Sequence, residues 1–182
     1  MDLFKIYTDQ DEVLHQKTEE VELPIPEDTK HTVLDMIEYL KLSQDEEFAK
    51  EHNIRAGVGI AAPQIGISKR FFAVCFDDGK KHYEYGLINP KIVSSSVKKA
   101  YLLSGEGCLS VPEDHKGYVY RYYKITIKGY DAVTDKNVTL RLVGYPAIVV
   151  QHEYDHLSGV LYYERIDKDN PFFEDPDAVP VE

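Results

Sequence analysis

The stretch Gln151-His152-Glu153-Tyr154-Asp155-His156 contains the pattern His-Glu-x-x-His. On an α-helix, residues four apart lie on one face, so both imidazole rings can reach a single metal ion. Glu153 lies between them, where its carboxylate can exchange protons with a water molecule on that ion. The stretch therefore predicts a helix that carries a metal centre, and a fold arranged around that helix.

The flanking residues indicate that this helix is buried. Gly144-Tyr145-Pro146 opens it, with proline suited to the first turn, and Gly159 is a natural cap at its end. The residues Ile148-Val149-Val150 are apolar, which favours a helix in the core over one on the surface. We therefore expect the two histidines to point into an enclosed site.

Three neighbours of the histidines are candidates for roles in this site. Ile148 lies one turn before His152 and Val149 one turn before Glu153, so both are candidates for the wall of a substrate pocket. Simple core packing is the alternative for each. Asp155 is a candidate to hold a ligand imidazole by its second nitrogen, and a solvated charge or a salt bridge is the alternative.

The third metal ligand separates a protease from other hydrolases. Cys108 lies in the glycine-bounded loop Gly105–Pro112, where a thiolate can approach a metal closely. Cys75 lies in an apolar strand pattern and is better explained as a buried small side chain. Glu164 and Glu174 are further candidates, although neither has an obvious helical context.

Composition narrows the class of protein. The chain has 182 residues, with 32 acidic and 21 basic side chains and a net charge of −11, which argues against a general surface for binding nucleic acid, DNA included. No apolar run is long enough to span a membrane, and the N-terminus does not resemble a signal peptide. With only two cysteines, we expect a reduced, cytoplasmic protein.

The hydrophobic pattern predicts an α+β fold of one catalytic domain over residues 1–182. Antiparallel β-sheets surround the late metal-carrying helix, and an early N-terminal helix begins near Asp28. The expected elements are a second helix at 44–51, a turn at 57–64, and strands at 71–76, 85–89, 91–97, 118–130 and 138–142. Pro90 is expected to separate two of these strands. The acidic tail 167–182 is expected to form a surface strap.

Three segments together resemble the signature motifs of the peptide deformylases. They are Gly57-Val58-Gly59-Ile60-Ala61-Ala62-Pro63-Gln64, Glu106-Gly107-Cys108-Leu109-Ser110 and Gln151-His152-Glu153-Tyr154-Asp155-His156. They occur in the family's order, and the resemblance runs from about Leu40 to about Asp167. The stretch Ser43-Gln44-Asp45-Glu46-Glu47 is similar to the longer subclass typical of Gram-positive bacteria.

The resemblance implies a metal centre and a reaction. Cys108, His152 and His156 would bind Fe²⁺, readily replaced by Ni²⁺, Co²⁺ or Zn²⁺, and water would take the fourth position. Glu153 would accept a proton from that water and deliver it to the leaving amine. The reaction would remove the formyl group from N-formyl-methionyl nascent peptides and release formate.

The resemblance also implies how the substrate is held. The side-chain amide of Gln64 and the backbone N–H of Leu109 would stabilise the oxyanion, and Gly59 would offer backbone hydrogen bonds to an extended peptide. We expect a monomer, and any transient docking to a ribosome would use a local basic patch such as Lys98 and Lys99.

The sequence departs from the family near its start. Many members carry Gly-x-Pro-x-Leu-Arg after an early Asp, whereas Asp9–His15 lacks the Gly, Pro and Arg. Tyr154 stands where smaller aliphatic residues are common, and Arg121 is expected either to touch substrate or to support its strand. The alternatives to a deformylase are a His-Glu-x-x-His metallopeptidase and a deformylase-like protein with reduced activity.

Overall fold

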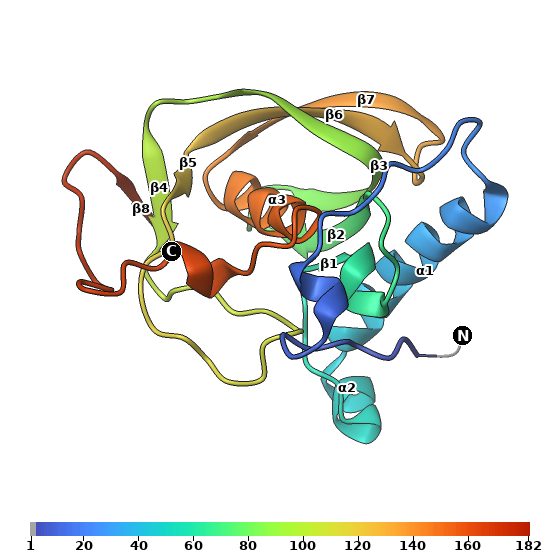
Figure 1. Cartoon of the computed structure of the whole chain (residues 1–182), viewed down its shortest axis with the longest axis horizontal. Coiled ribbons are helices and arrows are strands. Elements are labelled where there is room, and N and C mark those ends of the chain that lie inside the picture. Colours follow the sequence, from blue (N-terminus) through green and yellow to red (C-terminus); the bar gives the residue numbers. More distant parts are fainter. Residues whose placement is uncertain (1–2) are drawn as a thin grey trace.

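A computed structural model describes residues 3–182 and places the helix with both histidines, α3, in the middle of the molecule (Figure 1). The α-helices are α1 (Glu27–Ser43), α2 (Glu46–His52) and α3 (Tyr145–His156), and the short 3-10 helices are η1 (Glu12–His15), η2 (Ala62–Ile65) and η3 (Tyr162–Arg165). The strands are β1 (Gly59–Ala61), β2 (Phe71–Asp77), β3 (His82–Ser95), β4 (Lys99–Leu102), β5 (Arg121–Tyr122), β6 (Lys124–Asp131), β7 (Lys136–Val143) and β8 (Val179–Val181).

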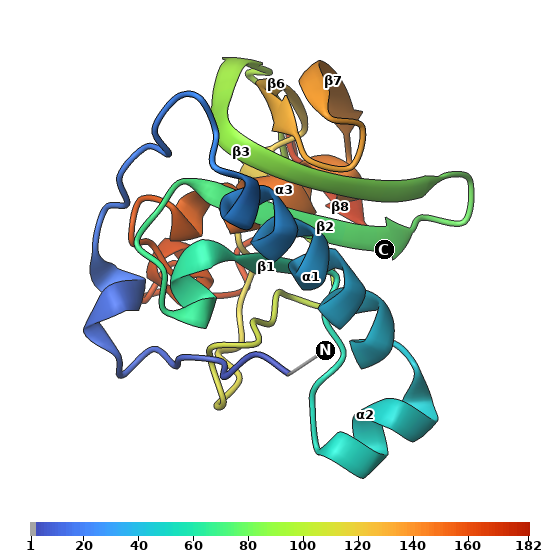
Figure 2. The ribbon, with the colours of Figure 1, turned by 90° about the vertical axis from the view of Figure 1, so that its right-hand side faces the viewer.

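The strands form a larger and a smaller sheet around α3. The larger sheet has the order β1-β2-β3-β6-β7 with antiparallel pairs, and the smaller has the order β5-β4-β8, in which β4 and β8 are parallel. In Figure 1 the larger sheet curves over α3 and the smaller sheet flanks it, while Figure 2 shows α1 outside the larger sheet. The predicted α+β class, with a late central helix and an early helix, is confirmed.

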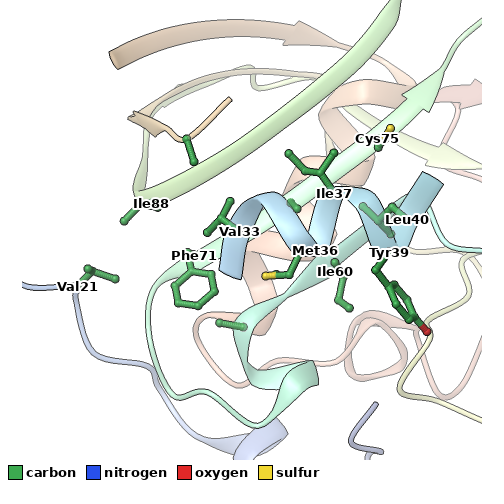
Figure 3. Close-up of a cluster of buried hydrophobic side chains, with 13 residues drawn as sticks. Val21, Val33, Met36, Ile37, Tyr39, Leu40, Ile60, Phe71, Cys75 and Ile88 are labelled. Atoms are coloured by element: carbon green, nitrogen blue, oxygen red, sulfur yellow. The ribbon is translucent and has the colours of Figure 1, made fainter. Parts of the chain in front are cut away.

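The larger sheet separates two apolar clusters because side chains alternate along β2. Phe71, Ala73 and Cys75 pack with α1, and Figure 3 shows this cluster with Val33, Met36, Ile37 and Leu40 at helical spacing. Phe72, Val74 and Phe76 pack on the other side with Val149 and Val150 of α3. Helix α3 is thus held between a packed sheet and the loops that carry the rest of the site.

Four details of the predicted elements differ from the structure. The stretch 57–64, predicted as a turn, contains β1 and η2. Pro90 does not separate two strands, because β3 runs through it with a register shift between Ile88 and Lys91. The strand predicted at 118–130 is divided into β5 and β6, and β4 was not predicted at all.

The N-terminal segment packs against the site although it lacks the family's usual residues. Leu14 in η1 is fully buried. The backbone N–H of Tyr7 donates to the carbonyl of Gln64 at 2.8 Å, and that of Asp9 donates to the carbonyl of Ser110 at 2.8 Å. These two hydrogen bonds join the segments that carry Gln64 and Cys108.

The C-terminal tail also closes on the body of the protein. Strand β8 pairs with β4, and the N–H of Leu103 donates to the carbonyl of Val181 at 2.9 Å. The sequence predicts no signal peptide at the N-terminus. Met1 and Asp2, its first two residues, lie outside the described residues. In residues 3–182, no helix combines the length and apolar character that crossing a membrane requires.

Candidate metal centre

Cys108, His152 and His156 come together around one point. One ligand atom from each lies within 4.8 Å of the others, and the Sγ atom of Cys108 is 3.4 Å from Nε2 of His156. The histidines project from one face of α3, and Cys108 reaches them from the loop after β4. A thiolate and two imidazoles form a donor set that suits divalent transition metals, so these residues fit such an ion.

The ends of α3 explain why the helix lies where it does. Gly144, with φ of 71°, turns the chain into the helix, and Pro146 follows in the first turn. After His156 the chain turns back at Gly159, which also has φ of 71°. A Cβ atom on Gly159 would lie 2.6 Å from the carbonyl carbon of His15, so the N-terminal segment packs tightly against this turn.

Glu106 orients His152. Its Oε1 atom accepts a hydrogen bond from Nδ1 of His152 at 2.8 Å, which leaves Nε2 facing the metal position. Arg121 donates to both oxygens of Glu106, at 2.7 and 2.8 Å. Although burial works against the charge, Arg121 and His152 lower the pKa of Glu106 to about 2, so the carboxylate is ionised.

Asp155 does not orient a ligand imidazole, so that interpretation was wrong. It accepts hydrogen bonds from Arg121 at 2.8 Å and from Arg165 at 2.5 Å. Glu106, which lies two residues before Cys108, takes the role that we considered for Asp155. The signal in the sequence was the glutamate of Glu106-Gly107-Cys108, which we had not considered for this role.

His156 is held in a form that can bind a metal. Burial lowers its pKa well below the usual range, so the imidazole is neutral, as a ligand must be. Its Nδ1 atom is buried and has no hydrogen-bond partner within residues 3–182. The ring is therefore held by packing and not by a carboxylate, and its Nε2 atom faces Sγ of Cys108.

Glu153 lies in the same enclosed space with one oxygen unpaired. It is 4% exposed, burial raises its pKa to about 7, and its Oε2 atom has no partner in the described part of the chain. A Cβ atom on Gly59 would lie 2.4 Å from Oε1 of Glu153. Only glycine lets β1 pass this close to the carboxylate.

Gln64 points its amide nitrogen at the same space. Its Oε1 atom accepts a hydrogen bond from the N–H of Ala61 at 2.8 Å, which fixes the orientation of the amide. Its Nε2 atom then lies 3.1 Å from Oγ of Ser110 and 3.5 Å from Sγ of Cys108. The amide is thus a donor placed beside the metal position.

A cavity of about 250 Å³ opens next to these groups. Its lining includes every residue that we expected to contact the reacting groups or the substrate except His156, namely Gly59, Gln64, Cys108, Leu109, Ile148, Val149, His152 and Glu153. Arg55 also lines the cavity, and it donates to the carbonyls of Cys108 and Val111, at 3.2 and 2.9 Å. These two hydrogen bonds hold the loop that carries Cys108 in place.

The remaining candidates lie elsewhere. Cys75 is buried in the cluster with α1, and Glu164 accepts a hydrogen bond from the N–H of Leu161 at 2.6 Å at the start of η3. Arg121 is 3% exposed and supports Glu106 from behind. The guanidinium of Arg70 lies over the ring of Tyr154, with its Cζ atom 5.4 Å from the centroid of that ring.

Comparison with known proteins identifies the family. The family model described as polypeptide deformylase matches residues 3–171. This chain belongs to the peptide deformylase family. The match extends the resemblance to the N-terminal segment, and within the tail 167–182 it covers residues 167–171.

Relatives of this deformylase cover nearly its whole length. Peptide deformylase 2 of Bacillus subtilis is 52% identical over 170 residues, covering 93% of this chain and 92% of the relative. A peptide deformylase of Oceanobacillus iheyensis is 51% identical over 163 residues, covering 89% and 88%. Most of the similar curated relatives come from Bacillota, which agrees with the Gram-positive subclass.

Solved deformylase structures share the fold. The crystal structure of peptide deformylase from Thermotoga maritima superposes with a TM-score of 0.71 at 34% identity, covering 92% of this chain and 99% of that one. A deformylase from Ehrlichia chaffeensis, in complex with actinonin, gives a TM-score of 0.76 at 30% identity, covering 94% and 92%.

Proposed function

We propose that this deformylase removes the formyl group from the N-terminal methionine of nascent polypeptides and releases formate. The observation that carries this proposal is the grouping of Cys108, His152 and His156 beside a buried Glu153 and the amide of Gln64. The same residues would make little sense in the metallopeptidase alternative, which assigns no role to the cysteine or the glutamine.

Cys108, His152 and His156 would hold a divalent metal ion. Fe²⁺ is the ion we propose, with Ni²⁺, Co²⁺ or Zn²⁺ as substitutes, because thiolate and imidazole donors suit these ions. When bound, the ion supplies a Lewis acid that polarises the formyl carbonyl and lowers the pKa of water. Glu106 and Arg121 keep His152 in the tautomer that presents Nε2.

Glu153 moves the proton. Its carboxylate takes a proton from the attacking water as the water oxygen bonds to the formyl carbon. It then gives that proton to the nitrogen of methionine as the carbon–nitrogen bond breaks, so formate and a free amine leave. Burial suits this exchange, because a carboxylate with a raised pKa both accepts and releases a proton near neutral pH.

Gln64 and Leu109 would stabilise the oxygen that becomes negative. The amide of Gln64 is already oriented by Ala61, so its Nε2 atom can donate without reorganising. We propose the backbone N–H of Leu109 as the second donor, since Leu109 follows Cys108 directly and lines the cavity. Two fixed donors beside the metal position leave little room for an acyl group larger than formyl.

The peptide would bind as an added strand along β1. Strand β1 is the outermost strand of its sheet, with β2 on its inner side, so its other edge can accept an extended chain. Gly59 would offer its backbone groups to that chain. Ile148 and Val149, which line the cavity and are nearly buried, would contact the methionine side chain.

We also propose that the chain works as a single catalytic domain and a monomer in the cytoplasm. The net charge of −11 disfavours broad attachment to RNA, so contact with the ribosome would be brief. Lys98 and Lys99 are the local basic pair that we propose for such docking. Lys99 lies over the ring of Tyr122, 3.6 Å from its centroid.

The decisive experiment measures formate released from a formyl-Met-Ala-Ser peptide by protein loaded with Fe²⁺ or Ni²⁺ without oxygen. We expect turnover by the wild type and its loss in Glu153→Ala with metal content retained. Cys108→Ser should lose metal. Cleavage of internal peptide bonds without formate release would favour the metallopeptidase, and metal binding without any turnover would favour a deformylase-like protein of reduced activity.

A further inference from the structure

A second group of metal-ligating side chains lies on the hairpin of β2 and β3, away from the candidate metal centre. Within residues 3–182, Cys75, His82 and Glu84 each offer a ligand atom within 4.8 Å of the other two. None of the three lines the cavity of the candidate metal centre. The deformylase reaction gives them no role.

The strand register explains why these side chains meet. Cys75 lies directly opposite Glu84, and Asp77 lies directly opposite His82. Residues two apart on a strand point to the same face, so all four project from one side of the hairpin. That side is the one covered by α1, since Cys75 packs in the α1 cluster.

An exposed carboxylate, Asp77, lies beside the Nδ1 atom of His82. The Nδ1 atom of His82 is 3.2 Å from Oδ2 of Asp77, and its Nε2 atom is 3.1 Å from Oε2 of Glu84. A carboxylate on the outer nitrogen of a ligand histidine is the usual arrangement around protein metals. With ligand bonds of about 2.1 Å, tetrahedral zinc places neighbouring nitrogen and oxygen ligands roughly 3.4 Å apart. The 3.1 Å between Nε2 of His82 and Oε2 of Glu84 is close to this separation.

Lys41 already forms an ion pair with Glu84. The Nζ atom of Lys41 lies 3.2 Å from Oε2 of Glu84, and its side chain is 43% exposed. A divalent ion would replace the Cys75 thiol proton and the proton on Nε2 of His82, and the flexible lysine would swing into solvent. The ligands would then be a thiolate, a neutral imidazole and a carboxylate, which together suit an ion of the zinc class.

We propose that Cys75, His82 and Glu84 form a second site for a divalent ion of the zinc class, with Asp77 orienting His82. The ion would cross-link β2 to β3, because its ligands come from both strands. His82 is half exposed, so water takes the remaining coordination position. The site is separate from catalysis.

The first test counts metal ions bound per chain after dialysis against Zn²⁺ and then against metal-free buffer. We expect two equivalents for the wild type and one for Cys75→Ser and for His82→Ala, both with deformylase activity retained. His31→Ala is the matched control, since His31 is an exposed histidine on α1, and should keep two. A single equivalent in the wild type, or two in Cys75→Ser, overturns the proposal.

The second test identifies the sulfur. In Cys108→Ser, the thiolate-to-cobalt absorption that remains on adding Co²⁺ should come from Cys75 and disappear in the double variant with Cys75→Ser. Lys41→Met, which leaves the ligands untouched, should tighten cobalt binding at this site about two- to fivefold, because an exposed competing ion pair is lost. No thiolate absorption in Cys108→Ser, or no tightening in Lys41→Met, contradicts the site.

Discussion

Glu106 shows how one residue that is not a ligand can decide the state of a metal centre. Its side chain is 3% exposed and accepts hydrogen bonds from both His152 and Arg121. A buried carboxylate of this kind fixes the tautomer of the imidazole and adds to its strength as a ligand. The same Arg121 also contacts Asp155, so one guanidinium connects the ligand loop to α3.

Glu106→Gln should weaken metal binding roughly 10–100-fold. The amide keeps the shape of the side chain, but its NH₂ group would face either His152 Nδ1–H or Arg121, both of which are donors. Metal affinity is measured by competition with a chelator, and Glu113→Gln, at an exposed position on the same loop, is the control. Unchanged affinity in Glu106→Gln would show that Glu106 does not tune the ligand.

Gly59→Ala should abolish most activity while leaving the metal in place. The new Cβ atom would lie 2.4 Å from Oε1 of Glu153, so either the carboxylate or β1 must move. Such displacements of a catalytic group cost on the order of 10²-fold in rate. Measuring both kcat/KM and metal content distinguishes a displaced Glu153 carboxylate from a lost metal ion. Gly79→Ala, at the hairpin turn with φ of 82° and open space around it, should lose stability and keep its rate.

At the scale of single residues, the sequence predicted the candidate metal ligands but not the side chains that hold them in place. The ligand spacing on α3 follows from helical periodicity, and the glycine-bounded loop singled out Cys108. The pairing of His152 with Glu106 joins residues 46 positions apart, which no local pattern encodes. Arg121 is also distant in sequence from Glu106, so its supporting role was not predicted. Asp155 lies close to the histidines in sequence, and for that reason we considered it as the partner of an imidazole.

At the scale of elements, the N-terminal segment acts as a brace for the site. Backbone hydrogen bonds from Tyr7 and Asp9 reach the segments of Gln64 and Ser110, so their strength does not depend on the family's usual Gly-x-Pro-x-Leu-Arg residues. Leu14 supplies the buried apolar anchor. This explains how the chain keeps its packing with a divergent N-terminal sequence.

Leu14→Ala should therefore reduce the free energy of unfolding by about 2–5 kcal/mol, the usual cost of truncating a fully buried leucine. Chemical denaturation followed by circular dichroism measures it. Leu23→Ala is the matched control, because Leu23 is 78% exposed, and should change stability by less than about 0.5 kcal/mol. Equal effects in the two variants would contradict anchoring by Leu14.

The elements that the sequence predicted well are those with their own periodicity. Helix α1 carries apolar residues at helical spacing, and α3 has a proline in its first turn. Strand β4 was missed because it has four residues and is defined by pairing with β5 and the distant β8. Pro90 misled the prediction because a bulge beside Asn89, with φ of 49°, accommodates it within β3.

At the scale of the whole molecule, the metal should stabilise the fold. Its proposed ligands join α3 to the loop after β4, so a bound ion would tie these two parts of the fold together. A ligand at 100 times its dissociation constant stabilises the folded state by about 2.7 kcal/mol. Chelation should therefore lower the thermal midpoint, and Ni²⁺ should restore it.

Calorimetry in a His82→Ala background checks this, since only Cys108, His152 and His156 then contribute. Cys108→Ser in the same background should show a smaller shift between the chelated and Ni²⁺-loaded states. If the His82→Ala protein has the same thermal midpoint in the chelated and Ni²⁺-loaded states, the ion does not stabilise the fold.

The pairing of β8 with β4 has a consequence for how the protein matures. A ribosome makes the chain from its N-terminus, so Gln64 and Cys108 emerge before the histidines of α3, and Val179–Val181 emerge after them. A partly made chain has the Cys108 thiol without the imidazoles of His152 and His156, and one edge of β4 stays unpaired until β8 has emerged. A translation product that stops before α3 therefore lacks two of the three proposed ligands and cannot assemble the metal centre.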